Sequence, residues 1–218
     1  MSVTSVTFPR WARRVLEPIA RRHGFRWQRD ELWLQRDSNH GVLYLPHRAY
    51  GREVDFSLRI GVVSTRLWNL ERENRVAQGL PDEMSIGSLH LQRDVADLLG
   101  KDGPVVWTWH PEMDAAATGD LQREVVAVAE QTAVPALVRY MSDEAIRDVY
   151  LQRRPFRILG PEGVRGLLAL LEALGPGELV EEVRAELDQP DEELERLRAL
   201  ARSGRLGRAV DVVEHSGE

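Results

Sequence analysis

The stretch from Glu53 to Val63 alternates strictly between apolar and polar side chains, and it constrains the fold more than any other part of the sequence. Successive side chains of a β-strand point to opposite faces, so this pattern predicts one strand with one buried face. The side chains expected in the core occupy every second position: Val54, Phe56, Leu58, Ile60 and Val62. We therefore expect a sheet whose apolar face is covered by another layer.

Other segments supply partner strands. Residues 25–36 are typical of a β-hairpin, in which we expect Gln28 to lie opposite Trp33. A further strand is expected from Val42 to about His47, and another from Val105 to His110. Alternation within the last of these places its two tryptophans on one face.

The first helix is expected over residues 8–23, where apolar side chains recur at spacings of three and four. Pro9 suits its first turn and Gly24 suits the left-handed position after its last turn. A longer helix, with a kink at Pro135, is predicted over residues 120–141. The remaining helices are expected at 66–77, 94–99, 143–152, 161–174, 178–188 and 190–203.

Together these elements predict an α+β fold: an antiparallel sheet of about four to five strands with helices on one face, plus a C-terminal all-helical extension. We expect an α+β domain over residues 1–155 and an acidic helical extension over 156–218. The charge distribution supports this division. Residues 1–60 carry 11 basic and 6 acidic side chains, whereas residues 161–218 carry 7 basic and 14 acidic ones.

Four motifs give the chain a resemblance to a known bacterial family: LEPIARRHGF (16–25), the hairpin ending LWLQRD (32–37), VDFSLRIGVV (54–63) and VPALVRYMS (134–142). They resemble the domain-of-unknown-function family numbered four-three-zero-four, over about residues 8–150. The resemblance implies an α+β fold with an antiparallel sheet. It implies no catalytic residues, because none is established for that family.

A candidate binding face lies on the side of the expected sheet opposite the first helix. Strand alternation gathers basic, amide and aromatic side chains there, and the candidate residues are Arg26, Gln28, Trp33, Gln35, Asp55, Arg59 and His110. Exposed Trp and Arg together are typical of interfaces. The opposing interpretation is that the C-terminal helices cover this side and bury Trp33 as part of the core.

Motifs for metal, cofactor or catalysis are not found in the sequence. The chain has no cysteine, and its six histidines show no HxxxH or HExxH spacing. No GxSxG, GxGxxG or Walker loop occurs either. We therefore expect no catalytic residue, metal or cofactor. No apolar run reaches the length of a membrane helix and no signal core begins the chain, so we expect a cytoplasmic protein without membrane contact.

These observations favour a non-enzymatic intracellular interaction protein, of the inhibitor, immunity or adaptor type. We expect it to bind another protein through its sheet face or its acidic helices. The alternative is an enzyme or nucleotide-binding module that holds a small anionic ligand with Arg26, Trp33, Arg59 and His110. Nucleic-acid binding is disfavoured by the formal net charge of −6.

Overall fold

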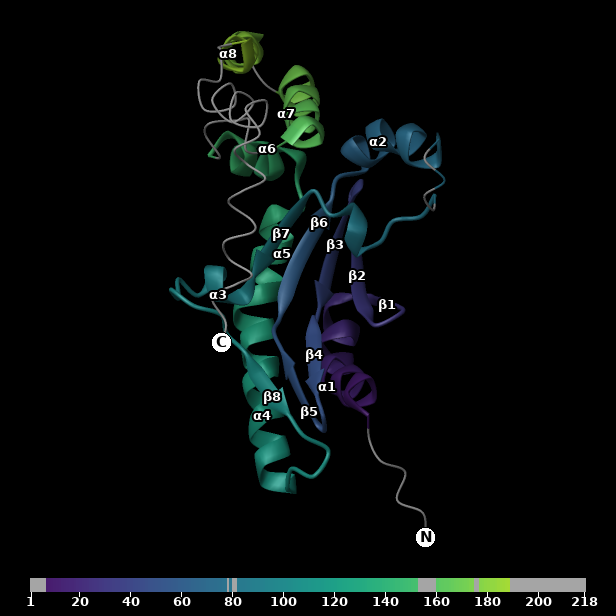
Figure 1. The fold of residues 1–218 in the computed structure, drawn as a ribbon, viewed down its shortest axis with the longest axis vertical. Helices are drawn as coiled ribbons and strands as arrows, with labels where there is room; N and C mark the ends of the chain where they lie inside the picture. Colours follow the sequence, from purple (N-terminus) through teal and green to yellow (C-terminus); the bar gives the residue numbers. More distant parts are fainter. Residues whose placement is uncertain (1–6, 78, 80–81, 153–159, 175–176, 189–218) are drawn as a thin grey trace, which may run out of the picture.

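The computed structural model describes residues 7–77, 79, 82–152, 160–174 and 177–188, and it has the expected α+β fold (Figure 1). Antiparallel strands form the middle of the molecule, with α-helices packed around them. The helices are α1 (Phe8–His23), α2 (Thr65–Ala77), α3 (Val95–Leu98), α4 (Ala115–Val128), α5 (Val134–Tyr140), α6 (Asp143–Leu151), α7 (Gly160–Leu174) and α8 (Gly177–Asp188).

The described strands form two antiparallel sheets. The larger sheet has the order β1 (Arg26–Gln28), β2 (Glu31–Arg36), β3 (Asn39–Tyr44), β6 (Arg59–Val63) and β7 (Leu91–Asp94). The smaller sheet has the order β4 (His47–Tyr50), β5 (Glu53–Phe56) and β8 (Trp107–Trp109). The sequence pattern predicts only one sheet and does not indicate β4.

The alternating stretch 53–63 is not one strand, because it divides between β5 in the smaller sheet and β6 in the larger one. The backbone at the break is bonded elsewhere: Ser57 donates its N–H to the Pro46 carbonyl at 3.1 Å, and the Leu58 carbonyl accepts from Val95 at 3.0 Å. The alternation itself persists through the break. All five apolar side chains that are expected in the core are buried there: Val54, Phe56, Leu58, Ile60 and Val62.

The β1–β2 hairpin closes more tightly than predicted. Gln28 pairs with Glu31 rather than with Trp33, and Trp33 pairs with Arg26. Arg29 adopts a left-handed φ of 56°, which allows a turn of two residues. Because the register differs by two residues, every side chain keeps its predicted face.

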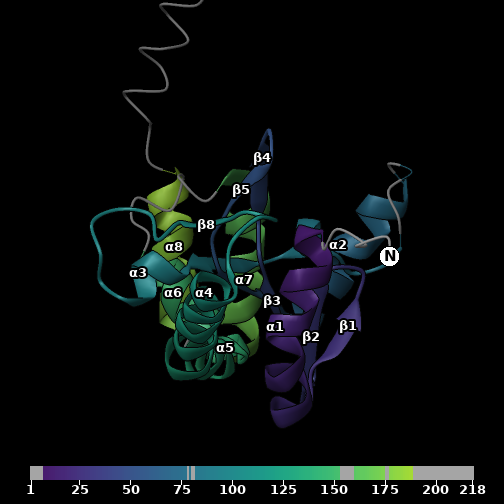
Figure 2. The same cartoon turned by 90° about the horizontal axis from the view of Figure 1, so that it is seen from below.

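The first helix, α1, has the predicted bounds and ends at Gly24, whose φ of 77° is left-handed. Its apolar stripe packs on an aromatic cluster that joins it to the smaller sheet. The Phe8 ring lies 5.0 Å from that of Phe56, and the Trp11 ring lies 6.3 Å from that of Trp109. Figure 2 shows α1 and α4 side by side.

The opposite face of the larger sheet is not open throughout. Trp33 is only 7% exposed there, which contradicts its expected place on a wet face. Trp33 belongs to a buried cluster that also contains Trp68 of α2, and Met84 and Leu89 pack against this cluster. Among the described residues, the cluster around Trp33 includes side chains of α2 and of the segment before β7, whereas the buried side chains of α7 and α8 belong to the main core.

The long helix predicted over 120–141 is observed as α4 and α5 joined by a π-helical segment, Ala129–Ala133. The segment ends just before Pro135, which has no N–H to continue the usual helical ladder. The predicted α6 is confirmed, with Ser142 accepting a hydrogen bond from the Ala145 N–H as its N-cap.

The C-terminal region is helical as expected, and its apolar residues join the main core. Those buried on α7 and α8 are Leu167, Leu170, Leu171, Val180 and Val183. The helix predicted over 190–203 lies outside the described residues. The division at residue 155 stays a prediction.

Candidate functional site

A hollow of about 660 Å³ lies at the β1–β2 edge of the larger sheet, and we call it the edge hollow. Its lining combines two tryptophans with basic, amide and acidic side chains: Gly24, Arg26, Trp27, Gln28, Trp33, Gln35, Asp37 and His40. Four of the seven residues predicted for the binding face therefore come together here.

Strand pairing brings these side chains together. Arg26 lies opposite Trp33 across the first strand pair, and Gln35 lies opposite His40 across the next. Paired residues point to the same face of a sheet. These four residues of the predicted face therefore lie together at this edge of the sheet.

The floor of the edge hollow is fixed by local contacts. The Trp33 Nε1 donates to Glu31 Oε2 at 2.9 Å, and the His40 ring lies 6.4 Å from the Trp33 ring. Burial lowers the pKa of His40, which disfavours the charged form of its imidazole. Gln28 donates from Nε2 to the Met84 carbonyl at 3.3 Å.

The other three predicted residues lie away from the edge hollow. Asp55 accepts a 2.7 Å hydrogen bond from the Thr108 hydroxyl in the smaller sheet. His110 follows β8, and its Nδ1 accepts from the Glu112 N–H at 3.1 Å. Arg59 donates to Asp94 at 3.0 Å within the larger sheet. The structure therefore does not bring the seven residues into one site.

A basic surface that the sequence does not predict lies beside the edge hollow. Arg13 of α1 places its guanidinium 5.0 Å from the centre of the Trp27 ring, an arrangement that allows a cation–π interaction. Trp27 also donates from Nε1 to Glu17 at 2.8 Å. The sequence does show that arginines recur on the polar side of the first helix. It does not show that these arginines lie next to Trp27, because that contact joins two separate elements.

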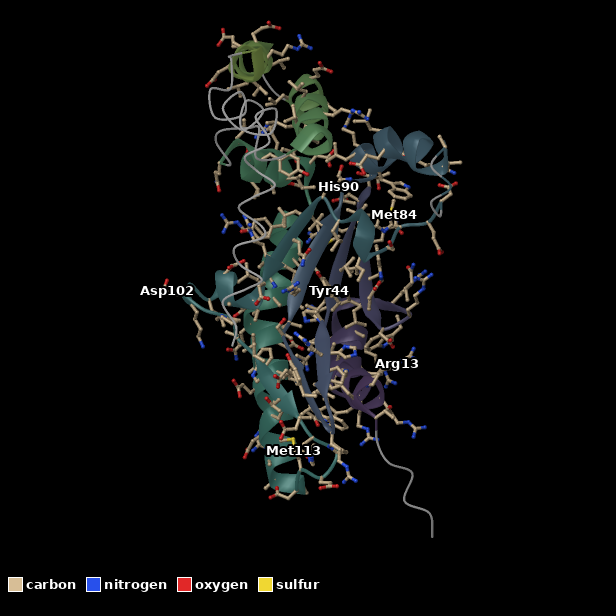
Figure 3. The ribbon with its side chains drawn as sticks, viewed as in Figure 1. Arg13, Tyr44, Met84, His90, Asp102 and Met113 are labelled. Carbon is tan, nitrogen blue, oxygen red and sulfur yellow. The ribbon has the colours of Figure 1, made fainter. Side chains whose placement is uncertain are left out.

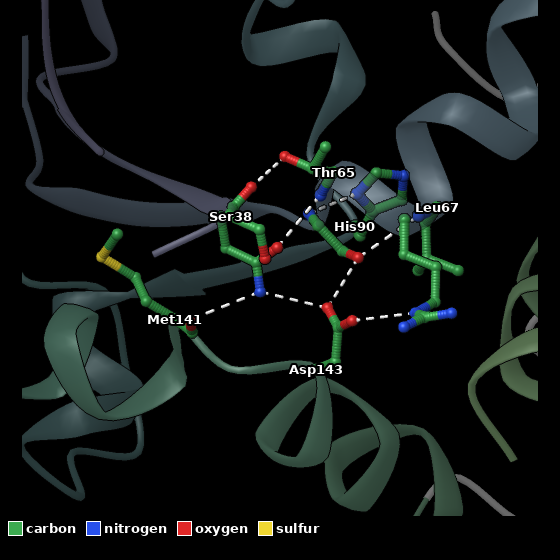
Figure 4. A network of polar contacts seen from close by, with 9 residues as sticks. Ser38, Thr65, Leu67, His90, Met141 and Asp143 are labelled. Carbon is green, nitrogen blue, oxygen red and sulfur yellow. Dashed lines mark hydrogen bonds and ion pairs between the residues drawn. The ribbon is translucent and has the colours of Figure 1, made fainter. Parts of the chain in front are cut away.

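A second cluster missed by sequence analysis is a buried polar network at the start of α2 and α6 (Figure 4). Its buried members are Asn39, 4% exposed, and Ser64, which is fully buried. The Asn39 side-chain oxygen accepts from the Thr65 N–H, and the Ser64 hydroxyl donates to Asp143 at 2.7 Å. The network joins the start of β3 to the first turns of both helices.

His90 belongs to the same network, but its geometry does not make Ser64 a nucleophile. The His90 Nδ1 accepts from the backbone N–H of Ser64 at 3.0 Å, while the hydroxyl of Ser64 is bonded to Asp143. A serine nucleophile needs a base within reach of its hydroxyl. The Ser64 hydroxyl also accepts from the Leu67 N–H at the start of α2. The network therefore caps α2 and links it to α6.

Within the described ranges, no three histidine, aspartate or glutamate side chains gather closely enough to hold a metal ion. In the same part of the chain, every helix is too short or too polar to cross a bilayer.

Comparisons with family models, with curated proteins and with solved structures find no match for this chain. The resemblance to the family numbered four-three-zero-four stays an expectation from the sequence.

Proposed function

We propose that the protein is a non-enzymatic binding protein of the inhibitor, immunity or adaptor type, and that it contacts another protein at the edge hollow. One observation carries the proposal. A concave site at a sheet edge is lined by Arg26, Trp27 and the amides of Gln28 and Gln35. Tryptophan and arginine contribute a large share of the binding energy at protein interfaces, and concavity allows a partner side chain to be desolvated.

Binding of a small anionic molecule is the second candidate. The volume of the edge hollow lies within the range of small-molecule sites, and among the described residues no carboxylate is ion-paired with Arg26. Two residues that this function would use are engaged elsewhere, since Arg59 bonds Asp94 and His110 bonds a backbone N–H. Arg26 is then the one arginine among the residues that line the edge hollow, and a single guanidinium favours a protein partner over a small anion.

Photo-crosslinking in the host cell tests the proposal. A photoreactive amino acid replaces Gln28 in the edge hollow or, as a control, exposed Thr108 in the smaller sheet. We expect position 28 to capture a protein that position 108 does not. A partner captured only at position 108 would refute the proposed site.

The captured protein is then purified and titrated against variants. We expect the double substitution of Arg26→Gln and Gln35→Ala to weaken binding by about tenfold or more, which corresponds to about 1.4 kcal/mol. Asp55→Ala, outside the edge hollow, should change affinity less than about twofold. Saturable quenching of tryptophan fluorescence by inorganic phosphate, with no protein captured, would overturn the proposal in favour of the small anion.

A further inference from the structure

We infer that the partner carries an acidic segment, and that this segment lies along a basic stripe on α1 next to the edge hollow. The stripe consists of Arg10, Arg13, Arg14 and Arg21. The inference rests on the proposed function, because it names the chemistry of the partner that the edge hollow would bind.

Helical periodicity gathers the stripe on one side of α1. Positions 10, 14, 17 and 21 follow the spacing of four, three and four that aligns side chains along a helix, and position 13 flanks them. The buried side chains of α1 lie on the opposite side: Phe8, Trp11, Ala12, Val15, Leu16, Ile19 and Ala20. All four arginines are exposed, so the stripe faces solvent along the length of the helix.

The stripe has an excess of positive charge that its own carboxylate does not balance. Glu17 is the one acidic residue of α1, and it already accepts from Trp27 and from Arg21 at 2.8 and 2.9 Å. The Trp27 hydrogen bond, followed by that of Arg21, lowers the pKa of Glu17, so the side chain is ionised and engaged at neutral pH. Among the described residues, Arg10 and Arg14 have no ion-pair partner.

Trp27 makes the stripe continuous with the edge hollow. Its ring lines the edge hollow and also lies beneath the Arg13 guanidinium. Figure 3 shows Arg13 on the side of α1 that lies next to β1. A partner segment seated in the edge hollow would therefore extend directly along the stripe.

An acidic protein segment fits this surface better than a nucleic acid does. The whole chain carries a formal net charge of −6, and carboxylates of Glu17 and Asp37 interrupt the basic surface. Such interruptions repel a continuous phosphate backbone, whose binding depends on neutralising many successive phosphates. Arginine forks pair with single carboxylates, which a protein segment can place between the interruptions.

A fluorescently labelled decaglutamate peptide serves as the probe, and its anisotropy is measured with the full chain. We expect the peptide to bind, with affinity that falls as salt rises. The substitutions Arg10→Gln, Arg13→Gln and Arg14→Gln together should weaken binding by about tenfold or more. Their matched control is Arg123→Gln, Arg139→Gln and Arg184→Gln, which removes the same charge from exposed helical positions and should change affinity less than about twofold.

Three results would overturn the inference: no binding of decaglutamate, equal loss in both triple variants, or tighter binding of a uridine decamer or of phosphatidylserine vesicles than of the peptide. The affinity of the captured partner for the variants shows whether the acidic segment alone or the whole proposed function is refuted. A partner that loses affinity with the variants at Arg26 and Gln35 but not with the α1 triple leaves the proposed function standing and refutes the acidic segment. A partner affected by neither set refutes both.

Discussion

Asn39 and Asp143 stand 104 positions apart in the sequence, yet the Asn39 Nδ2 donates a hydrogen bond of 3.0 Å to Asp143 Oδ1. The same amide group lies 3.4 Å from the Met141 carbonyl, and its oxygen accepts from Thr65. One buried side chain thus satisfies three polar groups on two other segments, the start of α2 and the junction between α5 and α6. A buried polar group that loses its partner retains the full cost of its desolvation.

Asn39→Ala should therefore lower the free energy of unfolding by about 1–3 kcal/mol, because it leaves the Thr65 N–H without its acceptor. Urea unfolding followed by circular dichroism measures this loss. Ser38→Ala is the matched control, since Ser38 is exposed and contributes only its backbone carbonyl, to the Thr65 hydroxyl. Equal losses for the two variants would show that the network does not stabilise the fold.

Phe56→Ala should lower the free energy of unfolding by about 3–5 kcal/mol through loss of packing and formation of a cavity. Phe56 is 2% exposed and its ring contacts those of Phe8, Trp11 and Trp107. Ser57→Ala, at the next position and only half-buried, should have a far smaller effect in the same urea titration. A comparable loss for Ser57→Ala would contradict the one-sided burial of this segment.

Gly41→Ala and Gly119→Ala should change stability in opposite directions. A Cβ at Gly41 would lie 2.6 Å from the Met141 sulfur and 3.0 Å from Leu137, which is fully buried. We expect a loss of about 1–3 kcal/mol from this overpacking. Gly119 lies within α4 with room for a methyl group, so alanine there should gain up to about 1 kcal/mol from helix propensity. Thermal melts of both variants test the signs, and a stabilised Gly41→Ala would disprove the close approach of α5 to β3.

Glu130→Gln should lower stability at neutral pH but not in acid. Glu130 accepts from His23 at 3.1 Å and from Arg22 at 2.8 Å, which ties the end of α1 to the π-helical segment. The His23 hydrogen bond is the main cause of the lowered pKa of Glu130. A carboxylate whose folded-state pKa is lowered stabilises the fold fully above its ordinary pKa of about 4.5, and this contribution is lost as the pH falls through the folded-state value.

Urea unfolding of wild type and Glu130→Gln from neutral to acidic pH measures this dependence. The two curves should converge as Glu130 becomes protonated. Glu124→Gln provides the control, because Glu124 is exposed on the neighbouring helix and its substitution should change the free energy of unfolding by less than about 0.5 kcal/mol at neutral pH. A difference that persists unchanged into acid would mean that the charge of Glu130 is not what stabilises the fold.

Local signals in the sequence predict much of the fold. The bounds of α1, its end at Gly24 and the cap at Ser142 depend on neighbours within a few positions. The division of residues 53–63 between two sheets depends instead on the backbone of Pro46 and Val95, which the alternating pattern does not contain. The sequence pattern therefore predicts which side chains are buried and leaves open which sheet they belong to.

The candidate site shows the same limit. Strand alternation correctly places Arg26, Trp33 and Gln35 on one face, because this depends only on the period of a strand. Trp33 shares its buried cluster with Trp68 of α2, and the sequence around Trp33 does not indicate that this distant side chain lies there. The contact between Arg13 and Trp27 could not be predicted either, because it depends on how α1 packs against β1.

The stretch from Glu53 to Val63, which contributes one strand to each sheet, restricts where this chain can accept insertions and deletions. The alternation runs without a break from β5 of the smaller sheet into β6 of the larger sheet. One extra residue between Phe56 and Arg59 would therefore move the apolar side chains of one of these strands from the buried face to the exposed face. Insertions or deletions of single residues should therefore be rejected at this point, whereas the exposed β4–β5 turn at Gly51 can accept them. Homologous chains that vary in length are expected to do so at that turn and to keep the spacing between Phe56 and Ile60.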